Sequence, residues 1–157
     1  MKKLSVTLKL SICAMALCGL LLYFGAIPLF ALSMRTAYPE FANRFWPWLA
    51  FLWGSALPCF GVLFYGWRVA GEIGRGNAFS GENAASLRTV ARLAVLDTVY
   101  FALGNIILFL LNMSHPGIAL GLMAVCVVGV IVAAVADTLS KLIAEAARLR
   151  EEQDLTI

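Results

Sequence analysis

Charged side chains are scarce in this sequence: Asp, Glu, Lys and Arg make up 13% of its 157 residues, whereas a soluble domain usually carries about a quarter. Histidine occurs once, at position 115, so histidine-based metal sites and Ser/His/Asp catalysis have no support. The cysteines lie in apolar runs without CxxC spacing, which argues against a zinc site or a redox motif: Cys13, Cys18, Cys59 and Cys126. We therefore expect no enzymatic activity, no catalytic residue, no metal and no cofactor.

In place of charge the sequence has long apolar blocks, and 62% of its residues are hydrophobic. The stretch between Lys9 and Arg35 holds 25 residues without a charge, and the stretch between Arg44 and Arg68 holds 23. Two further blocks, 93–112 and 116–136, contain a single charge, Asp97. About 20 apolar residues cross a ~30 Å hydrocarbon core. The sequence therefore predicts an all-α fold, one membrane domain over residues 1–157, with four transmembrane helices at about 10–32, 48–67, 93–112 and 116–136.

The basic residues are distributed unequally between the two sides that four spans define. One side holds both termini, the loop 68–92 and the tail 137–157, with ten Lys and Arg residues; the other side holds only Arg35 and Arg44. The positive-inside rule then predicts cytoplasmic termini. The basic residues are too dispersed for a nucleic-acid surface, so we expect no direct nucleic-acid binding. Their expected contact is the lipid bilayer, at the phosphate level of the inner leaflet.

Prolines, glycines and caps predict where helices bend and stop. Pro28 and Pro58 lie inside apolar runs, where each removes a backbone donor and favours a kink. Residues 39–44 between two prolines are typical of a short interfacial helix. The glycine-rich stretch 71–76 predicts an irregular loop, and Ser80 is a suitable N-cap. From there we expect one continuous helix over 81–111, and the fourth span also continues beyond the membrane.

Polar residues deep in an apolar run occur only in the third span. Asp97, Asn105 and Asn112 lie within an arc of about 80° on a helix, so we expect them to face the bundle interior. An acid inside a membrane is costly and is a functional candidate by default. The structural alternatives are an ion pair of Asp97 with an arginine such as Arg68, near the inner interface, and interhelical hydrogen bonds from the asparagines. Asp137 is a second acid to consider at the inner interface.

Two patterns on the fourth helix predict packing. Gly117 and Gly121 form a GxxxG motif, which permits close helix approach. Further along, apolar residues recur at alternating spacings of three and four, which predicts a stripe against Ala84, Leu87 and Ala91 of the helix before the third span; the stripe comprises Val132, Val135, Leu139, Leu142, Ala146 and Leu149.

Two stretches resemble a known family. The loop residues are Gly76, Phe79, Ser80, Asn83, Leu87 and Arg88, and the tail residues are Leu149, Glu151, Glu152, Asp154, Leu155, Thr156 and Ile157. In these stretches, and in its four spans, the chain resembles the bacterial domain-of-unknown-function 2975 family, with Gln153 where Asn is more usual. The resemblance implies a bacterial inner-membrane protein of unassigned activity. It also implies a regulatory partner, since relatives are often encoded beside small helix-turn-helix regulators.

Two functional hypotheses follow. The first is a regulatory or interaction protein that binds a partner on its cytoplasmic face, through Phe79, Asn83, Leu87, Arg88, Leu149, Glu152, Asp154, Leu155 and Ile157. The second is a small transporter or channel that uses the polar stripe of Asp97, Asn105 and Asn112. Four short helices enclose little volume, so a pore would require a homo-oligomer.

Overall fold

The computed structural model describes residues 2–37 and 39–154, and within them it contains helices and short connections but no strand. The prediction of an all-α fold is therefore confirmed. The elements are α1 (Lys2–Leu21), the π-helix η1 (Leu22–Ala26), α2 (Ile27–Ala37), the 3₁₀-helix η2 (Pro39–Arg44), α3 (Phe45–Gly54), α4 (Ala56–Gly74), α5 (Gly81–Leu110) and α6 (Pro116–Asp154). The short helix expected at residues 39–44 is thus present as η2.

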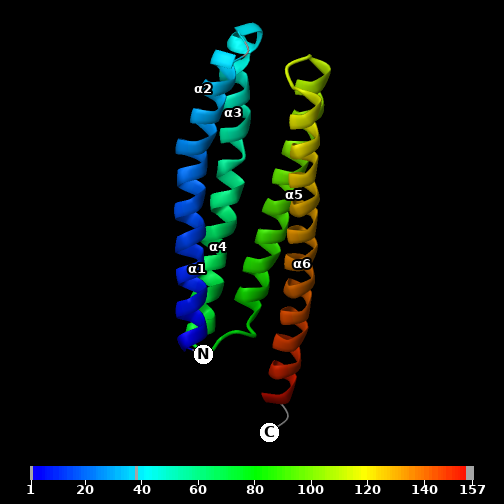
Figure 1. Ribbon diagram of the computed structural model, residues 1–157. Coiled ribbons are helices and arrows are strands. Elements are labelled where there is room, and N and C mark those ends of the chain that lie inside the picture. The colour runs from blue at the N-terminus through cyan, green and yellow to red at the C-terminus, as the bar shows by residue number, and fades with distance from the viewer. Residues whose placement is uncertain (1, 38, 155–157) are drawn as a thin grey trace.

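Four helical runs are long and apolar enough to cross a membrane: Lys2–Thr36, Phe45–Gly74, Gly81–Leu110 and Pro116–Gln153. The expected four spans are thereby confirmed. The runs lie side by side, with Lys2 and Asp154 at one end, the termini end, and with η2 and the α5–α6 connection at the other, the turn end (Figure 1). The 39 residues of α6 extend about 58 Å at 1.5 Å per residue. Because a hydrocarbon core is ~30 Å thick, a large part of α6 lies outside it.

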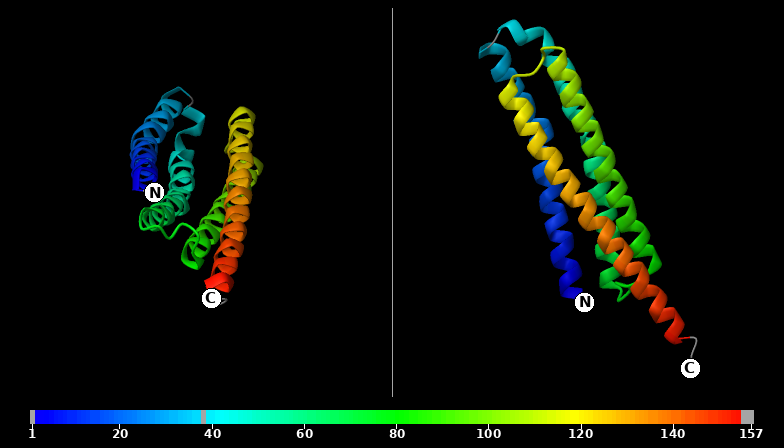
Figure 2. Two further views of the ribbon diagram at one scale, coloured as in Figure 1. Left: turned by 90° about the horizontal axis from the view of Figure 1, so that it is seen from below. Right: turned by 90° about the vertical axis from the view of Figure 1, so that its right-hand side faces the viewer.

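The helices form an open arc rather than a closed bundle. Helix α1 packs against α4, α4 against α5 and α5 against α6, whereas α1 and α6 make no extended contact. The view along the helices shows this order directly (Figure 2). We call the run from α1 to α4 the first hairpin, and α5 with α6 the second hairpin. The arc leaves a groove between α1 and α6 that runs back to α4 and α5.

Both prolines inside the apolar runs, Pro28 and Pro58, coincide with interruptions one turn earlier. Pro58 cannot donate to the carbonyl of Gly54, and α3 ends at Gly54 with a turn at Ser55. Pro28 cannot donate to the carbonyl of Phe24, which lies inside the π-helix η1. A proline ring also clashes with the carbonyl four residues before it, so each interruption falls where the chemistry requires it. The expected kinks at both prolines are present.

The loop between the hairpins is shorter than the glycines suggested. Helix α4 continues through Gly71 to Gly74, so only residues 75–80 connect it to α5. Two residues after the end of α4 comes Gly76, whose φ of +88° favours glycine. Its N–H bonds to the carbonyl of Ile73 at 3.2 Å, and the N–H of Asn77 bonds to that of Glu72 at 2.9 Å. This pair of bonds is a Schellman motif, and it replaces the expected irregular segment over 71–76.

Helix α5 is a single helix, as predicted, with a side-chain cap at its start and a left-handed residue after its end. The backbone N–H of Asn83 donates to the hydroxyl of Ser80 at 3.3 Å. At the turn end, Asn112 has a φ of +53° and donates to the carbonyl of Phe109 at 3.0 Å. Asn112 therefore caps the helix from outside. The expected polar stripe of three residues is reduced to Asp97 and Asn105.

Helix α6 packs on α5 through small residues and not through the predicted stripe of larger ones. The buried positions on α6 are Cys126, Ala133, Ala136, Ser140 and Ala147. The hydroxyl of Ser140 donates to the carbonyl of Ala84 on α5 at 2.8 Å. Small side chains occupy the contact with α5 because they let the two helix backbones approach more closely. The larger residues point away from α5, and Leu142 is 62% exposed.

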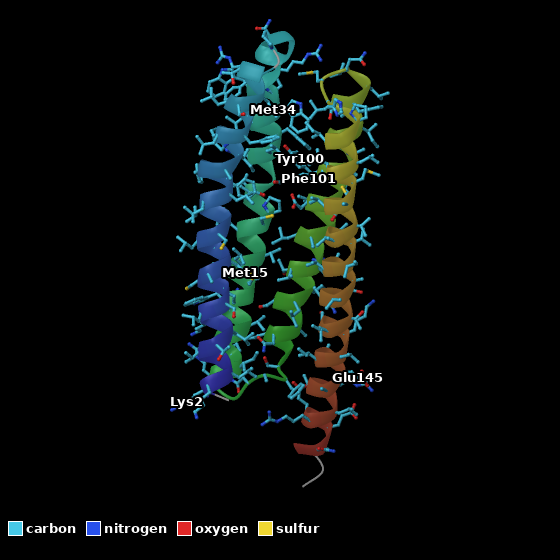
Figure 3. All side chains as sticks on the ribbon, viewed as in Figure 1. Lys2, Met15, Met34, Tyr100, Phe101 and Glu145 are labelled. Atoms are coloured by element: carbon cyan, nitrogen blue, oxygen red, sulfur yellow. The ribbon has the colours of Figure 1, made fainter. Side chains whose placement is uncertain are left out.

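The two hairpins are joined by aromatic side chains near the turn end. The ring of Phe51 on α3 stacks on Tyr100 with centroids 5.3 Å apart and contacts Phe101 at the same separation. The hydroxyl of Tyr100 donates to the carbonyl of Phe51 at 2.8 Å. Tyr100 and Phe101 lie on α5 (Figure 3). Trp48 adds a bond from its indole N–H to the carbonyl of Met113 at 2.7 Å.

Candidate functional site

The groove between the hairpins is the site that draws on all four helical runs. Its volume is about 350 Å³, at the lower end of the range of small-molecule pockets. Most of its lining is apolar, with contributions from Met15 on α1, Phe60 on α4, Phe101 on α5 and Val125 on α6. Within the described part of the chain, Asp97 is the only charged residue that lines it. An acid in an apolar cavity at this position is the feature that requires an explanation.

Asp97 has few partners. Its Oδ2 accepts a bond from the thiol of Cys59 on α4 at 3.5 Å, and a thiol is a weak donor. Its Oδ1 is buried and has no hydrogen-bond partner. The expected pairing with an arginine is not formed: no ion pair in the described chain includes Asp97, and Arg68 instead lies 5.9 Å from the ring of Tyr65.

Cys59 lies between Asp97 and two further hydroxyl groups. The hydroxyl of Tyr23, in the π-helix η1, lies 2.7 Å from that of Ser55 and 3.7 Å from the sulfur of Cys59. Ser55 donates its single proton to the carbonyl of Leu52 at 2.9 Å, so Tyr23 is the donor to Ser55. We call Tyr23, Ser55, Cys59 and Asp97 the polar chain.

The polar chain gathers where the backbone is irregular. Tyr23 lies in η1 and Ser55 lies at the break between α3 and α4. π-Helical turns inside α-helices occur frequently at functional sites. Ser55 is fully buried, so its hydroxyl is committed to this arrangement. The two hydroxyl groups thus lie near the two proline interruptions, and the thiol of Cys59 is the group that contacts the carboxylate.

The polar chain also lies well inside the span. Cys59, which contacts Asp97, is nine residues before Arg68 along α4, a rise of roughly 13 Å. At the level of Arg68 lie Lys9 and Trp67, with the ammonium 5.2 Å from the indole ring. Asp97 is therefore deeper than its five-residue separation from Arg92 suggested.

The other intramembrane candidates lie elsewhere. Asn105 is buried and donates to the carbonyl of Ala119 on α6 at 3.0 Å, which is an interhelical bond of the kind expected from asparagine. Asn112 is in the α5–α6 turn. Asp137 forms an exposed ion pair with Lys141 at 2.6 Å. Of the four candidate residues Asp97, Asn105, Asn112 and Asp137, only Asp97 lines the groove.

The residues considered for partner binding divide between two environments. Asn83 is 1% exposed, and its amide donates to the carbonyls of Asn77 and Ala78, so it braces the loop rather than facing a partner. Leu87 is half-buried. Phe79, Arg88, Leu149 and Glu152 are exposed. Asp154 ends α6, while Leu155 and Ile157 lie outside the described residues.

Sequence reasoning missed Tyr23, Ser55 and Cys59. A signal was present for two of them, because a tyrosine and a serine in the middle of long apolar runs each carry a polar group that needs a partner. Among the described residues no three His, Cys, Asp or Glu side chains group closely enough to hold a metal ion. The polar chain is thus a set of hydrogen-bonding groups with one acid.

Four apolar helical runs, a half-buried acid and an open lateral groove define a small multi-pass helical membrane protein. The family described as "Protein of unknown function (DUF2975)" matches residues 29–157, and the chain belongs to this family. The chain is similar to "Uncharacterized membrane protein YoaS" of Bacillus subtilis (strain 168), with 24% identity over 155 residues that cover 98% of this chain and 97% of that protein. No solved structure matches the chain.

Proposed function

We propose that this protein is a regulatory or interaction protein of the bacterial inner membrane, with its termini end in the cytoplasm. The orientation is supported by charge. The termini end carries the basic residues of α1, of the segment 68–92 and of the tail, whereas the turn end carries Arg35 and Arg44. Basic residues favour the cytoplasmic side.

The observation that carries the proposal is a row of large apolar residues on α6, exposed where the helix is charged. Val135, Leu139, Leu142 and Leu149, which we call the outer stripe, are 53%, 44%, 62% and 50% exposed. The outer stripe follows a 4-3-7 spacing along one side of α6, away from the alanines that pack on α5. Ion pairs of Lys141 with Asp137 and of Arg148 with Glu145 and Glu152 lie along α6 from residue 137 onward, which supports a location outside the hydrocarbon core for Leu139, Leu142 and Leu149.

An apolar row at this spacing, flanked by charges, is suited to a second amphipathic helix. The partner we propose is a small soluble regulator with a helix-turn-helix fold, docked on the outer stripe. Phe79 in the connecting loop is 55% exposed and lies at the same end of the molecule. A second copy of this chain is the competing occupant, and the experiment below separates the two.

Photocrosslinking in living cells tests the proposal. A crosslinking residue at position 142 or 149 should give a discrete adduct with a soluble protein, identified by mass spectrometry. The same residue at position 147 is the control, since Ala147 is buried against α5 and should crosslink only within the chain. An adduct of twice the chain mass would indicate a homodimer and would contradict the proposed regulator.

Substitution adds a second test. The double change Leu142→Glu and Leu149→Glu should abolish the adduct formed from a crosslinker at position 139. Lys141→Gln is the matched control, because Lys141 is exposed on another side of α6, and it should leave the adduct intact. Equal crosslinking in both variants would refute a docking role for the outer stripe.

A second candidate function is transport by an oligomer, and the groove favours it. Asp97 lines a cavity bordered by all four helical runs, and the cavity is open between α1 and α6. The four helices of one chain enclose no continuous channel of their own in this open arc, so a second copy would be needed to close it. Flux into liposomes that is lost in Asp97→Asn would support this function, and absence of flux would refute it.

A further inference from the structure

We infer that the groove at Asp97 is a binding site for a hydrophobic organic cation that enters sideways from the lipid. This inference goes beyond partner docking on α6 and deepens the transport candidate by naming its ligand class. It rests on three features: the open side of the groove, the apolar lining and the incompletely bonded carboxylate.

The open side determines how a ligand enters. Helices α1 and α6 border the groove without packing along each other, so its mouth faces laterally, in the plane of the spans. Met15 and Val125 line the two sides, and both are about half exposed, at 52% and 51%. A molecule that partitions into the bilayer can reach this opening, whereas a strongly hydrated solute would have to cross hydrocarbon first.

The lining determines the body of the ligand. The walls are built mainly from aliphatic and aromatic side chains, with Phe60 and Phe101 among them. Such walls offer dispersion contacts and few hydrogen bonds. Sugars, nucleotides and other solutes with many polar groups would lose hydration without compensation. The cavity volume of about 350 Å³ suits a compact apolar body.

Asp97 determines the head group. One oxygen accepts from a thiol and the other has no partner, and rotation about the Cβ–Cγ bond can present either oxygen to the groove. Among the described residues no Lys or Arg lines the groove, so this part of the chain supplies no countercharge there. A buried carboxylate is stabilised chiefly by an opposite charge or by strong donors. A cationic ligand supplies that charge, whereas an anionic one would be repelled.

The polar chain orients the carboxylate without neutralising it. Cys59 donates to Oδ2 from α4, and Tyr23, which also lines the groove, lies against the sulfur at 3.7 Å. The three aromatic side chains among the lining residues, Tyr23, Phe60 and Phe101, add π-systems that can attract a cation. The arrangement thus combines one charge with aromatic surface, which is the chemistry that recognises a bulky organic cation.

Equilibrium dialysis of the full chain in nanodiscs of uncharged lipid, with radiolabelled tetraphenylphosphonium as the probe, tests the inference. Empty nanodiscs give the lipid background. We expect saturable binding of about one probe per chain, weakened at least tenfold in Asp97→Asn. Asp137→Asn is the matched control, because that acid is exposed and paired with Lys141, and it should bind as the unaltered chain does. No saturable binding above the empty discs would overturn the inference.

A second variant protects against a folding artefact. Val125→Trp keeps the carboxylate and fills the mouth of the groove from an exposed position; it should weaken binding as well. Circular dichroism should show the same helix content in all variants. Full binding in both Asp97→Asn and Val125→Trp would show that the probe lies elsewhere. The assay contains no cytoplasmic partner, so its failure would leave the docking proposal on α6 untouched, and failed crosslinking from α6 would leave the groove untouched.

Discussion

Both hairpins consist of two helical runs long enough to cross a membrane, but their backbones differ in regularity. The first contains a π-helix, a 3₁₀-helix and a break at Ser55, and the hydroxyl and thiol groups that approach Asp97 come from it. The second consists of two unbroken helices that pack closely along their length. Irregular backbone therefore accompanies polar chemistry in one hairpin, and small side chains accompany close packing in the other.

The two hairpins therefore contribute different groups to the site at Asp97. The second hairpin holds Asp97 on the unbroken helix α5, and the first hairpin presents Tyr23 and Cys59 from segments next to the two prolines. The following predictions test this contrast, beginning with the close packing of the second hairpin.

The largest effect is expected from Gly129→Leu on α6. A Cβ at Gly129 would collide with the hydroxyl of Thr98 on α5, whereas nothing lies within 4 Å of a Cβ at Gly121 two turns earlier. Overpacking of this kind costs about 3 kcal/mol. Unfolding in mixed micelles, followed by circular dichroism, should show that loss for Gly129→Leu. Gly121→Leu is the matched control and should show no such loss; equal losses would mean that the hairpin is not closely packed at Gly129.

Gly121 and Gly129 also show which feature of helix packing could not be predicted from the sequence. The GxxxG motif of Gly117 and Gly121 predicted a close approach, yet Gly121 meets no neighbour and the crowded glycine is Gly129. A glycine that contacts another helix has the same local sequence signature as one that faces lipid. Spans, caps and proline breaks were predictable because hydropathy, N-capping and missing donors act within a few residues of the chain.

The partners of Asp97 were not predictable for a related reason. The depth of the acid and its neighbours depend on how α4 and η1 are aligned against α5, and this alignment is a property of tertiary packing. Likewise, the outer stripe follows a helical period but the period alone does not say which face meets α5. Alanines and Ser140 occupy that contact, and the leucines are left outside.

An intermediate effect is expected in the first hairpin from Ser55→Ala. Ser55 is fully buried, donates to Leu52 and accepts from Tyr23, so its loss leaves the tyrosine with a weak sulfur partner. Removal of a buried hydrogen-bond partner costs about 1 to 2 kcal/mol. A double-mutant cycle of Ser55→Ala with Tyr23→Phe, measured by the same unfolding assay, should give a coupling of about 1 kcal/mol, within the range for bonds between membrane helices. Strict additivity would show that the two hydroxyls do not interact.

The smallest effects are expected at the junction of the hairpins, where two glycines should respond with opposite sign. Gly76 has a φ of +88°, which an L side chain adopts at a cost of about 1 kcal/mol, so Gly76→Ala should lower the free energy of unfolding. Gly71 lies inside α4 with no atom near a Cβ, and alanine is preferred to glycine in a helix by about 0.5 to 1 kcal/mol. Gly71→Ala should therefore raise the free energy of unfolding. Chemical unfolding of the two variants side by side measures both; a gain from Gly76→Ala would mean that α4 continues past Gly76 and that the hairpins are joined by a helix instead of a capped turn.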